Sequence, residues 1–144
     1  MTDHKDLYRR YIGALIIKDG EAQDHALDRL LAADFIAHDL PGGLKDGRGA
    51  LKAFRRQVHI GFPDQTLTIE DLIAEDDRVA ARLTAVGMHL GEFAGIPATG
   101  RRITAEIFDI VRVAEDKIAE RWTMFDRGGL LTELHQRQAR IRDR

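Results

Sequence analysis

The chain has 144 residues, of which 44% are hydrophobic, and its formal net charge at pH 7 is −2. Such a length and composition suit one compact domain, residues 1–144, with enough apolar side chains for a genuine core. Charges of both signs are spread along the chain, and only the end from Arg137 to Arg144 is modestly basic. Nucleic-acid binding requires a concentrated basic face, so no nucleic-acid partner is expected.

Several other functional signals are missing from the sequence. It contains no cysteine, which excludes disulfides, thiol nucleophiles and thiolate metal sites. Its six histidines show none of the H-x-H, H-x-x-x-H or HExxH spacings, so no metal is expected. The N-terminus MTDHKDLYRR has no signal-peptide core, and no segment reaches the roughly 18 apolar residues of a membrane span. We therefore predict a cytoplasmic domain without membrane contact.

Three helices are predicted in the first half of the chain. From Asp3 to Lys18, apolar residues recur at steps of three and four, as in an amphipathic helix: Leu7, Tyr8, Tyr11, Ile12, Leu15 and Ile16. A second helix is predicted over Gln23 to Ala33, and a third from after Gly47 to before Pro63. Between these two, DFIAHD indicates a short extended segment and LPGGLKDG a loop.

The second half changes to a period of two, which predicts four strands. They lie within Gln65–Asp77, Asp77–Leu90, Arg102–Val113 and Lys117–Phe125. The phase of the first breaks near Asp71, where we expect a bulge. The segment RGGLLTELHQRQARIR predicts a last helix. This order indicates an α+β fold, with helices packed on one side of a curved antiparallel sheet.

Four short motifs occur in an order that resembles the SnoaL-like polyketide cyclases: GFPD, DRVAAR, HLGEFAGIPATGR and KIAERWTMFD. The resemblance runs from about Tyr8 to Leu134. It implies a cone-shaped barrel, in which three N-terminal helices pack on the concave face of a curved antiparallel sheet and a C-terminal helix follows. Ketosteroid isomerase and nuclear transport factor two share that fold. The resemblance also implies an activity without metal or cofactor.

Asp126 ends the last predicted strand, four residues after Trp122 and directly before the last helix. An aspartate there can cap the helix by accepting hydrogen bonds from its free backbone N–H groups. It can equally be an acid/base group, because desolvation in an apolar pocket raises a carboxyl pKa. The residues alone leave both interpretations open. In characterised members of the family, an aspartate at this position is the acid/base of an intramolecular aldol ring closure, so the resemblance favours catalysis.

The resemblance also points to His38 and Arg112. The family often has a histidine after the second helix, and His38 in FIAHD fits as a residue that orients the substrate. On the penultimate strand the characterised cyclases have histidine, where this chain has Arg112. A permanent cation cannot act as a base, but it can stabilise developing negative charge. A second departure is Arg121, where EHW is more usual.

Period two does not show which face of the strand Arg102–Val113 is concave. Asp109 falls on the apolar face, so either it acts in a pocket there or it pairs with an arginine in the wall. Arg112 lies on the other face, and the resemblance favours that face as the pocket. The expected catalytic residues are then Asp126, His38 and Arg112. The expected substrate-binding residues are Phe62, Phe108, Trp122, Met124 and His59.

We therefore predict acid/base chemistry by Asp126, of the aldol cyclase, isomerase or hydratase kind, on an apolar, oxygenated, polyketide-like molecule. One alternative is a non-catalytic ligand-binding or protein-interaction domain on the same fold. Another is an epoxide hydrolase of the limonene type, whose water-activating Asp/Arg/Asp set has no convincing spacing here. Apolar residues on both faces of the strands also predict a homodimer or tetramer through the outer face of the sheet.

Overall fold

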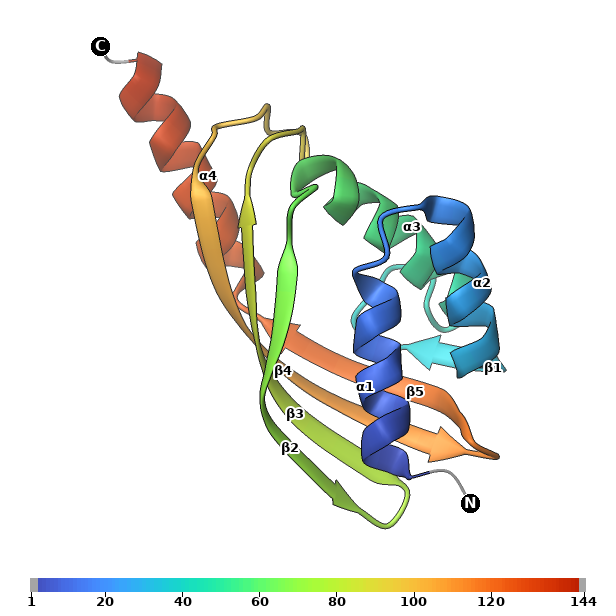
Figure 1. Ribbon diagram of the computed structural model, residues 1–144. Helices are drawn as coiled ribbons and strands as arrows, with labels where there is room; N and C mark the ends of the chain where they lie inside the picture. The colour runs from blue at the N-terminus through green and yellow to red at the C-terminus, as the bar shows by residue number, and fades with distance from the viewer. Residues whose placement is uncertain (1–2, 143–144) are drawn as a thin grey trace.

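A computed structural model describes residues 3–142 of the chain, and the side chains of residues 3–135. The elements over these residues are α1 (His4–Leu15), α2 (Gly20–Leu30), β1 (Leu31–Ala37), α3 (Gly47–Gly61), β2 (Thr66–Glu75), β3 (Arg78–Met88), β4 (Arg102–Ala114), β5 (Lys117–Phe125) and α4 (Arg127–Arg142). The long strands curl around the side on which α1, α2 and α3 lie, and α4 stands at one end of the sheet (Figure 1). This arrangement confirms the predicted α+β fold.

The sheet has five strands in the order β1-β5-β4-β3-β2. The last four strands along the chain pair antiparallel, as predicted, and two tight turns connect them in hairpins. Three residues of these turns have positive φ, between 51° and 61°: Asp76 in the first turn, and Glu115 and Asp116 in the second. Left-handed residues of this kind match the twist of hairpin strands. The expected bulge is present, because the register of β2 shifts between Ile69 and Asp71.

The first strand differs from the sequence prediction in two respects. The first four residues of DFIAHD, Asp34 to Ala37, belong to β1, which pairs parallel with β5 and makes the sheet mixed rather than wholly antiparallel. The helix predicted to reach Ala33 ends at Leu30, because Leu31 adopts an extended ψ of 142°. Leu31 is fully buried and pairs with Ile118 of β5, so tertiary packing outweighs the helical period at this point.

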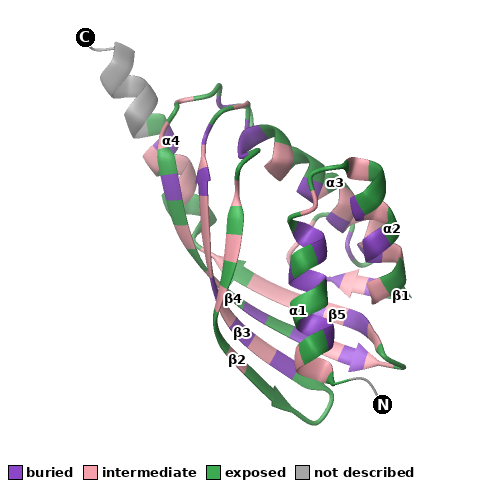
Figure 2. Cartoon of the chain, viewed as in Figure 1, coloured by how far each residue is buried: buried purple, intermediate pink, exposed green. Residues whose placement is uncertain are grey.

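The main core lies between α1 and the concave face of the sheet. The buried stripe of α1 packs against alternate residues of β3 and β4, and Figure 2 shows the same alternation of burial along these strands. A side-chain period of 3.6 on the helix thus meets a period of two on the strands. The members contributed by these three elements are Leu7, Tyr8, Tyr11, Ile12, Ala14, Leu15, Val79, Ala81, Leu83, Val111 and Val113.

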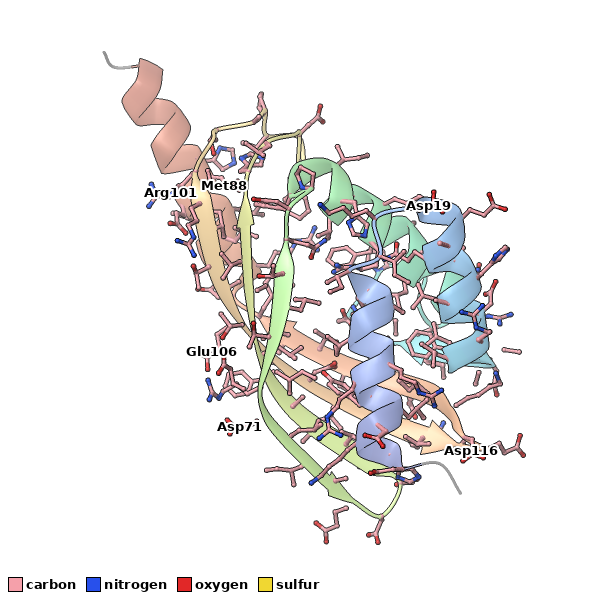
Figure 3. The ribbon with its side chains drawn as sticks, in the orientation of Figure 1. Asp19, Asp71, Met88, Arg101, Glu106 and Asp116 are labelled. Carbon is pink, nitrogen blue, oxygen red and sulfur yellow. The ribbon has the colours of Figure 1, made fainter. Side chains whose placement is uncertain are left out.

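A second apolar cluster closes the other end of the sheet. Phe62, Phe93, Ile96, Ile103 and Leu134 are buried together, and Leu130 and Leu131 of α4 pack against them. Arg101 also donates to Glu133 from its Nε at 2.8 Å, which ties α4 to the start of β4 (Arg101 is labelled in Figure 3). No helix within residues 3–142 is both long and apolar enough to cross a membrane.

Candidate active site in the concave face of the sheet

A cavity of about 120 Å³ lies between the concave face of the sheet and helices α1, α3 and α4. Most of its wall is apolar, with Ile12, Phe54, Val58, Phe62 and Leu130 among the contributing side chains. From β4 it receives Ile103, Ala105, Ile107 and Asp109, which are every second residue of the strand. A dry cavity of roughly 150 Å³ holds one benzene molecule, so this space is about the size of a single ring.

The Asp109 carboxyl group is the buried acid in this wall, with only 4% of the residue exposed. The Tyr8 hydroxyl donates to its Oδ2 at 2.8 Å, and the Thr123 hydroxyl donates to its Oδ1 at 2.9 Å. Burial raises the pKa of Asp109, although the Arg121 charge and both hydrogen bonds oppose the rise. A carboxyl with a raised pKa and fixed orientation can both take and return a proton.

Sequence position explains why these groups meet. Asp109 and Thr123 are direct partners in the β4–β5 register, so their side chains lie on the same face of the sheet. Tyr8 reaches them from the buried stripe of α1. Burial, followed by the charge of Asp109, raises the Tyr8 pKa far above its ordinary value, so its hydroxyl remains a donor.

A second buried network joins Arg121, Asp39 and Tyr11. Arg121 donates from Nε to Asp39 Oδ1 at 2.9 Å and from Nη2 to Asp39 Oδ2 at 2.6 Å. Its Nη1 donates to the Tyr11 hydroxyl at 3.1 Å. Burial works to lower the pKa of Arg121, but Tyr11, Asp39 and Asp109 outweigh it and raise the pKa, so Arg121 stays a cation. Asp39 and Arg121 also contribute to the cavity wall.

Two of the expected substrate-binding residues lie on or near α3. Phe62 lines the cavity and packs on Phe93 with ring centroids 5.3 Å apart, and its role in substrate binding stays a prediction. His59 does not line the cavity; its ring nitrogens contact the side-chain amides of Gln23 at 3.1 Å and Gln65 at 3.4 Å. Burial, followed by the Arg55 charge, lowers the His59 pKa. His59 therefore supports the end of α3 and does not face the cavity.

The expectation that the Arg112 face of β4 lines the cavity is wrong. The cavity takes the Asp109 face, and the other face is the convex surface of the sheet, where Phe108 is 56% and Met124 75% exposed. Phe108 pairs with Met124, and Ile110 with Trp122, in the β4–β5 register. These side chains line a groove of about 670 Å³ on the convex side.

His38 and Arg112 meet on that convex side. His38 Nε2 lies 2.6 Å from Glu120 Oε2, and its ring stacks on Trp122 with centroids 4.9 Å apart. Arg112 donates from Nε to Glu120 Oε1 at 2.7 Å. Arg112, followed by His38, lowers the Glu120 pKa. The structure thus brings these two predicted residues together, but away from the cavity.

Asp126 is exposed and is not part of the cavity wall, although its neighbour Phe125 is. Its Oδ1 accepts a hydrogen bond from the backbone N–H of Gly129 at 2.8 Å, in the first turn of α4. This contact is the geometry of a helix N-cap. An acid/base role for Asp126 stays a prediction, and Asp109 is the competing carboxyl.

The sequence contained signals for some of these residues. Asp109 stood out as a charge on an apolar face, and one of its two interpretations, a pocket on that face, matches the structure. Arg121 stood out as a departure from the family pattern. Arg55 had no signal, because it lies among the charged residues of an amphipathic helix. Among the described residues, no group of three or more histidine, aspartate or glutamate side chains is arranged to hold a metal ion.

Comparison with known proteins gives consistent results. A family model described as SnoaL-like polyketide cyclase matches residues 5–134. Aklanonic acid methyl ester cyclase DnrD of Streptomyces peucetius is 40% identical over 129 residues, which cover 83% of this chain and 82% of the relative. Aklanonic acid methyl ester cyclase DauD of Streptomyces sp. (strain C5) is 30% identical over 129 residues, covering 83% and 74%.

Solved structures agree with these sequence relatives. The chain resembles IdmH, a putative polyketide cyclase from Streptomyces antibioticus, with 31% identity, a TM-score of 0.74 and coverage of 90% of this chain and 96% of that one. It also resembles TsrD from Streptomyces laurentii, with 27% identity, a TM-score of 0.77 and coverage of 93% and 98%.

Proposed function

The chain belongs to the SnoaL-like polyketide cyclase family, and we propose that it catalyses a cofactor-free ring closure of a polyketide-like molecule, with Asp109 as the acid/base. The Asp109 carboxyl is the observation that carries this assignment. It is a buried acid with a raised pKa in the wall of a largely apolar cavity. Perturbed carboxyl groups in such cavities are typical of catalytic sites.

The aldol reaction needs one group that takes a proton and later returns it. The Asp109 carboxylate removes a proton from the carbon next to a substrate carbonyl, and the enolate carbon attacks a second carbonyl. One C–H bond breaks, one C–C bond forms, and the proton returns from Asp109 to the new alkoxide. Tyr8 and Thr123 use one acceptor site on each oxygen of Asp109 and leave others for the substrate.

The size of the cavity bears on the substrate. A volume of about 120 Å³ accommodates the reacting ring but not a whole multi-ring polyketide. We therefore expect the walls formed by Phe54, Phe62 and Leu130 to move apart when a larger substrate binds. The convex groove is larger, but His38, which was predicted to orient the substrate, is held there by Glu120 on an open sheet surface.

One observation supports the alternative function, hydration of an epoxide. Arg121 binds Asp39 directly, and its charge also acts on Asp109, so two acids and one arginine meet at the cavity. Sequence spacing did not reveal this set, since Asp39 and Asp109 are 70 positions apart in the chain. Water addition to an epoxide raises the product mass by one water, whereas ring closure leaves the mass unchanged. The two reactions are therefore distinguishable in one assay.

The test uses aklanonic acid methyl ester, the molecule that appears in the names of the two cyclase relatives, together with an epoxide-bearing analogue. Products are followed by chromatography and mass spectrometry. Asp109→Asn should lower kcat by about 10²–10⁴-fold, as expected for an acid/base group. Asp126→Asn is the matched control and should change kcat by less than about threefold, because an amide caps as well as a carboxylate.

The opposite pattern, with activity lost only in Asp126→Asn, would assign the acid/base role to Asp126 and overturn the Asp109 proposal. Tight binding of the ester without turnover by the wild type would favour the non-catalytic alternative.

We also propose that the chain self-associates through the convex face. Exposed large apolar side chains from β2, β4 and β5 gather there, which is unusual for a monomer surface. They are Ile73, Phe108, Ile110 and Met124. A homodimer or tetramer would cover them.

A further inference from the structure

Arg55 is a second buried cation in the cavity wall, and it differs from Arg121 in its partners. Only 6% of Arg55 is exposed, and it projects from α3 into the same cavity. Arg121 is neutralised by a two-bond pair with Asp39. Arg55 forms no ion pair with any carboxylate among residues 3–135; its polar contacts go to a carbonyl and an amide.

A count of N–H groups shows what remains free on Arg55. Its Nε and Nη2 donate to the Leu15 carbonyl at 3.1 and 2.8 Å, and Nη2 also donates to Gln65 Oε1 at 2.7 Å. These bonds use three of the five donors of a guanidinium. No residue from 3 to 135 accepts a hydrogen bond from Nη1. Nη1 is also not one of the fully buried side-chain nitrogen or oxygen atoms that lack a hydrogen-bond partner. Its two N–H groups therefore border open space, and the cavity is the space that Arg55 lines.

Arg55 has no counter-charge in contact with it. Arg55 and Arg121 are both cations, Asp39 forms its ion pair with Arg121, and among residues 3–135 the Asp109 oxygens accept from the Tyr8 and Thr123 hydroxyls and form no ion pair with either arginine. Burial, followed by the Arg121 charge, lowers the Arg55 pKa to about 10, so Arg55 is still charged at neutral pH. A buried charge without a counter-charge is costly, and a ligand can supply the missing partner.

We propose that the Nη1 edge of Arg55 is a binding subsite for an anionic oxygen of the ligand, such as a carboxylate, phenolate or enolate. The inference deepens the proposed function, since it rests on the same cavity and names the charge of its substrate. Leu15 and Gln65 hold the guanidinium in place, so Nη1 is preorganised. An enolate formed when Asp109 removes a proton would find its counter-charge there.

The test uses 4-nitrophenol, a single-ring probe whose absorbance distinguishes the phenolate from the neutral phenol. Titrating the probe with and without wild-type protein over a pH series gives the affinity for each form. We expect the wild type to bind the phenolate at least tenfold more tightly than the phenol, so the apparent pKa of the bound probe falls. Neutral 4-nitroanisole measures the apolar part of binding separately.

Arg55→Met keeps an unbranched side chain of similar length and removes the charge. It should abolish the preference for phenolate while leaving the affinity for 4-nitroanisole unchanged or stronger. Arg55→Lys keeps the charge and should retain part of the preference. Arg112→Met is the matched control, because Arg112 lies on the convex face, and it should leave both affinities unchanged.

The wild type alone can overturn the inference, even if Arg55→Met does not fold. Equal affinity for the two forms, preference for the neutral phenol, or no binding at millimolar probe would each do so. The binding equilibrium also separates this inference from the proposed function. Loss of phenolate preference in Arg55→Met, together with full turnover in Asp109→Asn, would support the subsite and overturn the Asp109 assignment. Unchanged phenolate preference in Arg55→Met, together with lost turnover in Asp109→Asn, would overturn the subsite and support the Asp109 assignment.

Discussion

Neighbouring residues of β4 occupy two different environments on the two faces of the sheet. On the concave face Asp109 is 4% exposed, and two hydroxyl groups satisfy its oxygens. On the convex face the adjacent Phe108 is 56% exposed. The charged residue is thus inside and the aromatic residue outside, the reverse of the usual distribution.

This inversion indicates where function resides. A buried carboxyl is costly, so its retention inside a cavity calls for a chemical reason. Exposed apolar side chains on a regular sheet call instead for a partner surface. The ion pairs of the two faces differ in the same way. Asp71 and Glu106 extend outwards on the convex side (Figure 3), where both form ion pairs with the exposed Arg82. The side chains of Arg121 and Asp39 are only 5% and 17% exposed.

The largest expected effect comes from breaking the enclosed ion pair. Arg121→Ala leaves Asp39 without its counter-charge and should lower the free energy of unfolding by about 3–5 kcal/mol. Arg82→Ala is the matched change on the convex face and should have little effect, because exposed pairs contribute little. Urea unfolding of both variants measures the difference. The double variant Arg121→Met with Asp39→Leu should recover most of the loss; equal losses in Arg121→Ala and Arg82→Ala would contradict the comparison.

The next prediction concerns the pH dependence of stability at Asp109. Burial raises the pKa of Asp109 in the folded state above its unfolded value of about 3.9. The folded state then binds the proton more tightly, so this stabilising contribution is full below about pH 4 and is lost as the pH rises through the folded pKa. Asp109→Asn cannot ionise and lacks this loss. Its stability relative to the wild type should therefore rise from pH 4 to pH 8.

Urea unfolding of the two proteins at matched pH values gives this difference directly. A difference that falls with increasing pH would mean that Arg121 holds Asp109 ionised, and the carboxyl would then be a fixed ion-pair partner rather than a proton carrier.

The fold was more predictable from the sequence than the site was. Periods of 3.6 and two placed the helices and the four antiparallel strands, because each element buries one face. The strand β1 was only half recognised. Its Leu31 continues the apolar period of α2, and only its pairing with Ile118, 87 positions further along the chain, makes it a strand residue.

The site was harder to predict, because a period of two divides a strand into two faces but does not show which face lines the cavity. Asp109 and Arg112 lie on opposite faces of β4, and the family resemblance favoured the wrong one. What distinguishes the faces is non-local: Tyr8 comes from α1 and Thr123 from β5. Arg55 depends likewise on the Leu15 carbonyl, which is free because α1 ends at that residue.

A smaller effect is expected from the convex face. Phe108→Glu places a charge in the proposed interface and should raise the dissociation constant of the assembly at least tenfold, or about 1.4 kcal/mol. Leu44→Glu, at a loop residue that is 73% exposed, is the matched control and should leave assembly unchanged. Sedimentation equilibrium at micromolar concentrations distinguishes an oligomer from the 16.2 kDa monomer. A wild type that sediments as a monomer would contradict self-association.

The smallest effect is expected at Asp126, where the cap of α4 and the competing acid/base role make different predictions. Asp126→Ala leaves the Gly129 N–H without its acceptor and should lower the free energy of unfolding by about 1 kcal/mol. Asp126→Asn should leave stability almost unchanged, since asparagine and aspartate cap equally well. Urea unfolding and the turnover assay are measured on the same three proteins. For a cap, turnover per folded molecule is equal in all three, because the carboxylate is exposed and outside the cavity wall. If Asp126→Asn keeps its stability and loses turnover, the first turn of α4 must move during the reaction and bring Asp126 to the substrate.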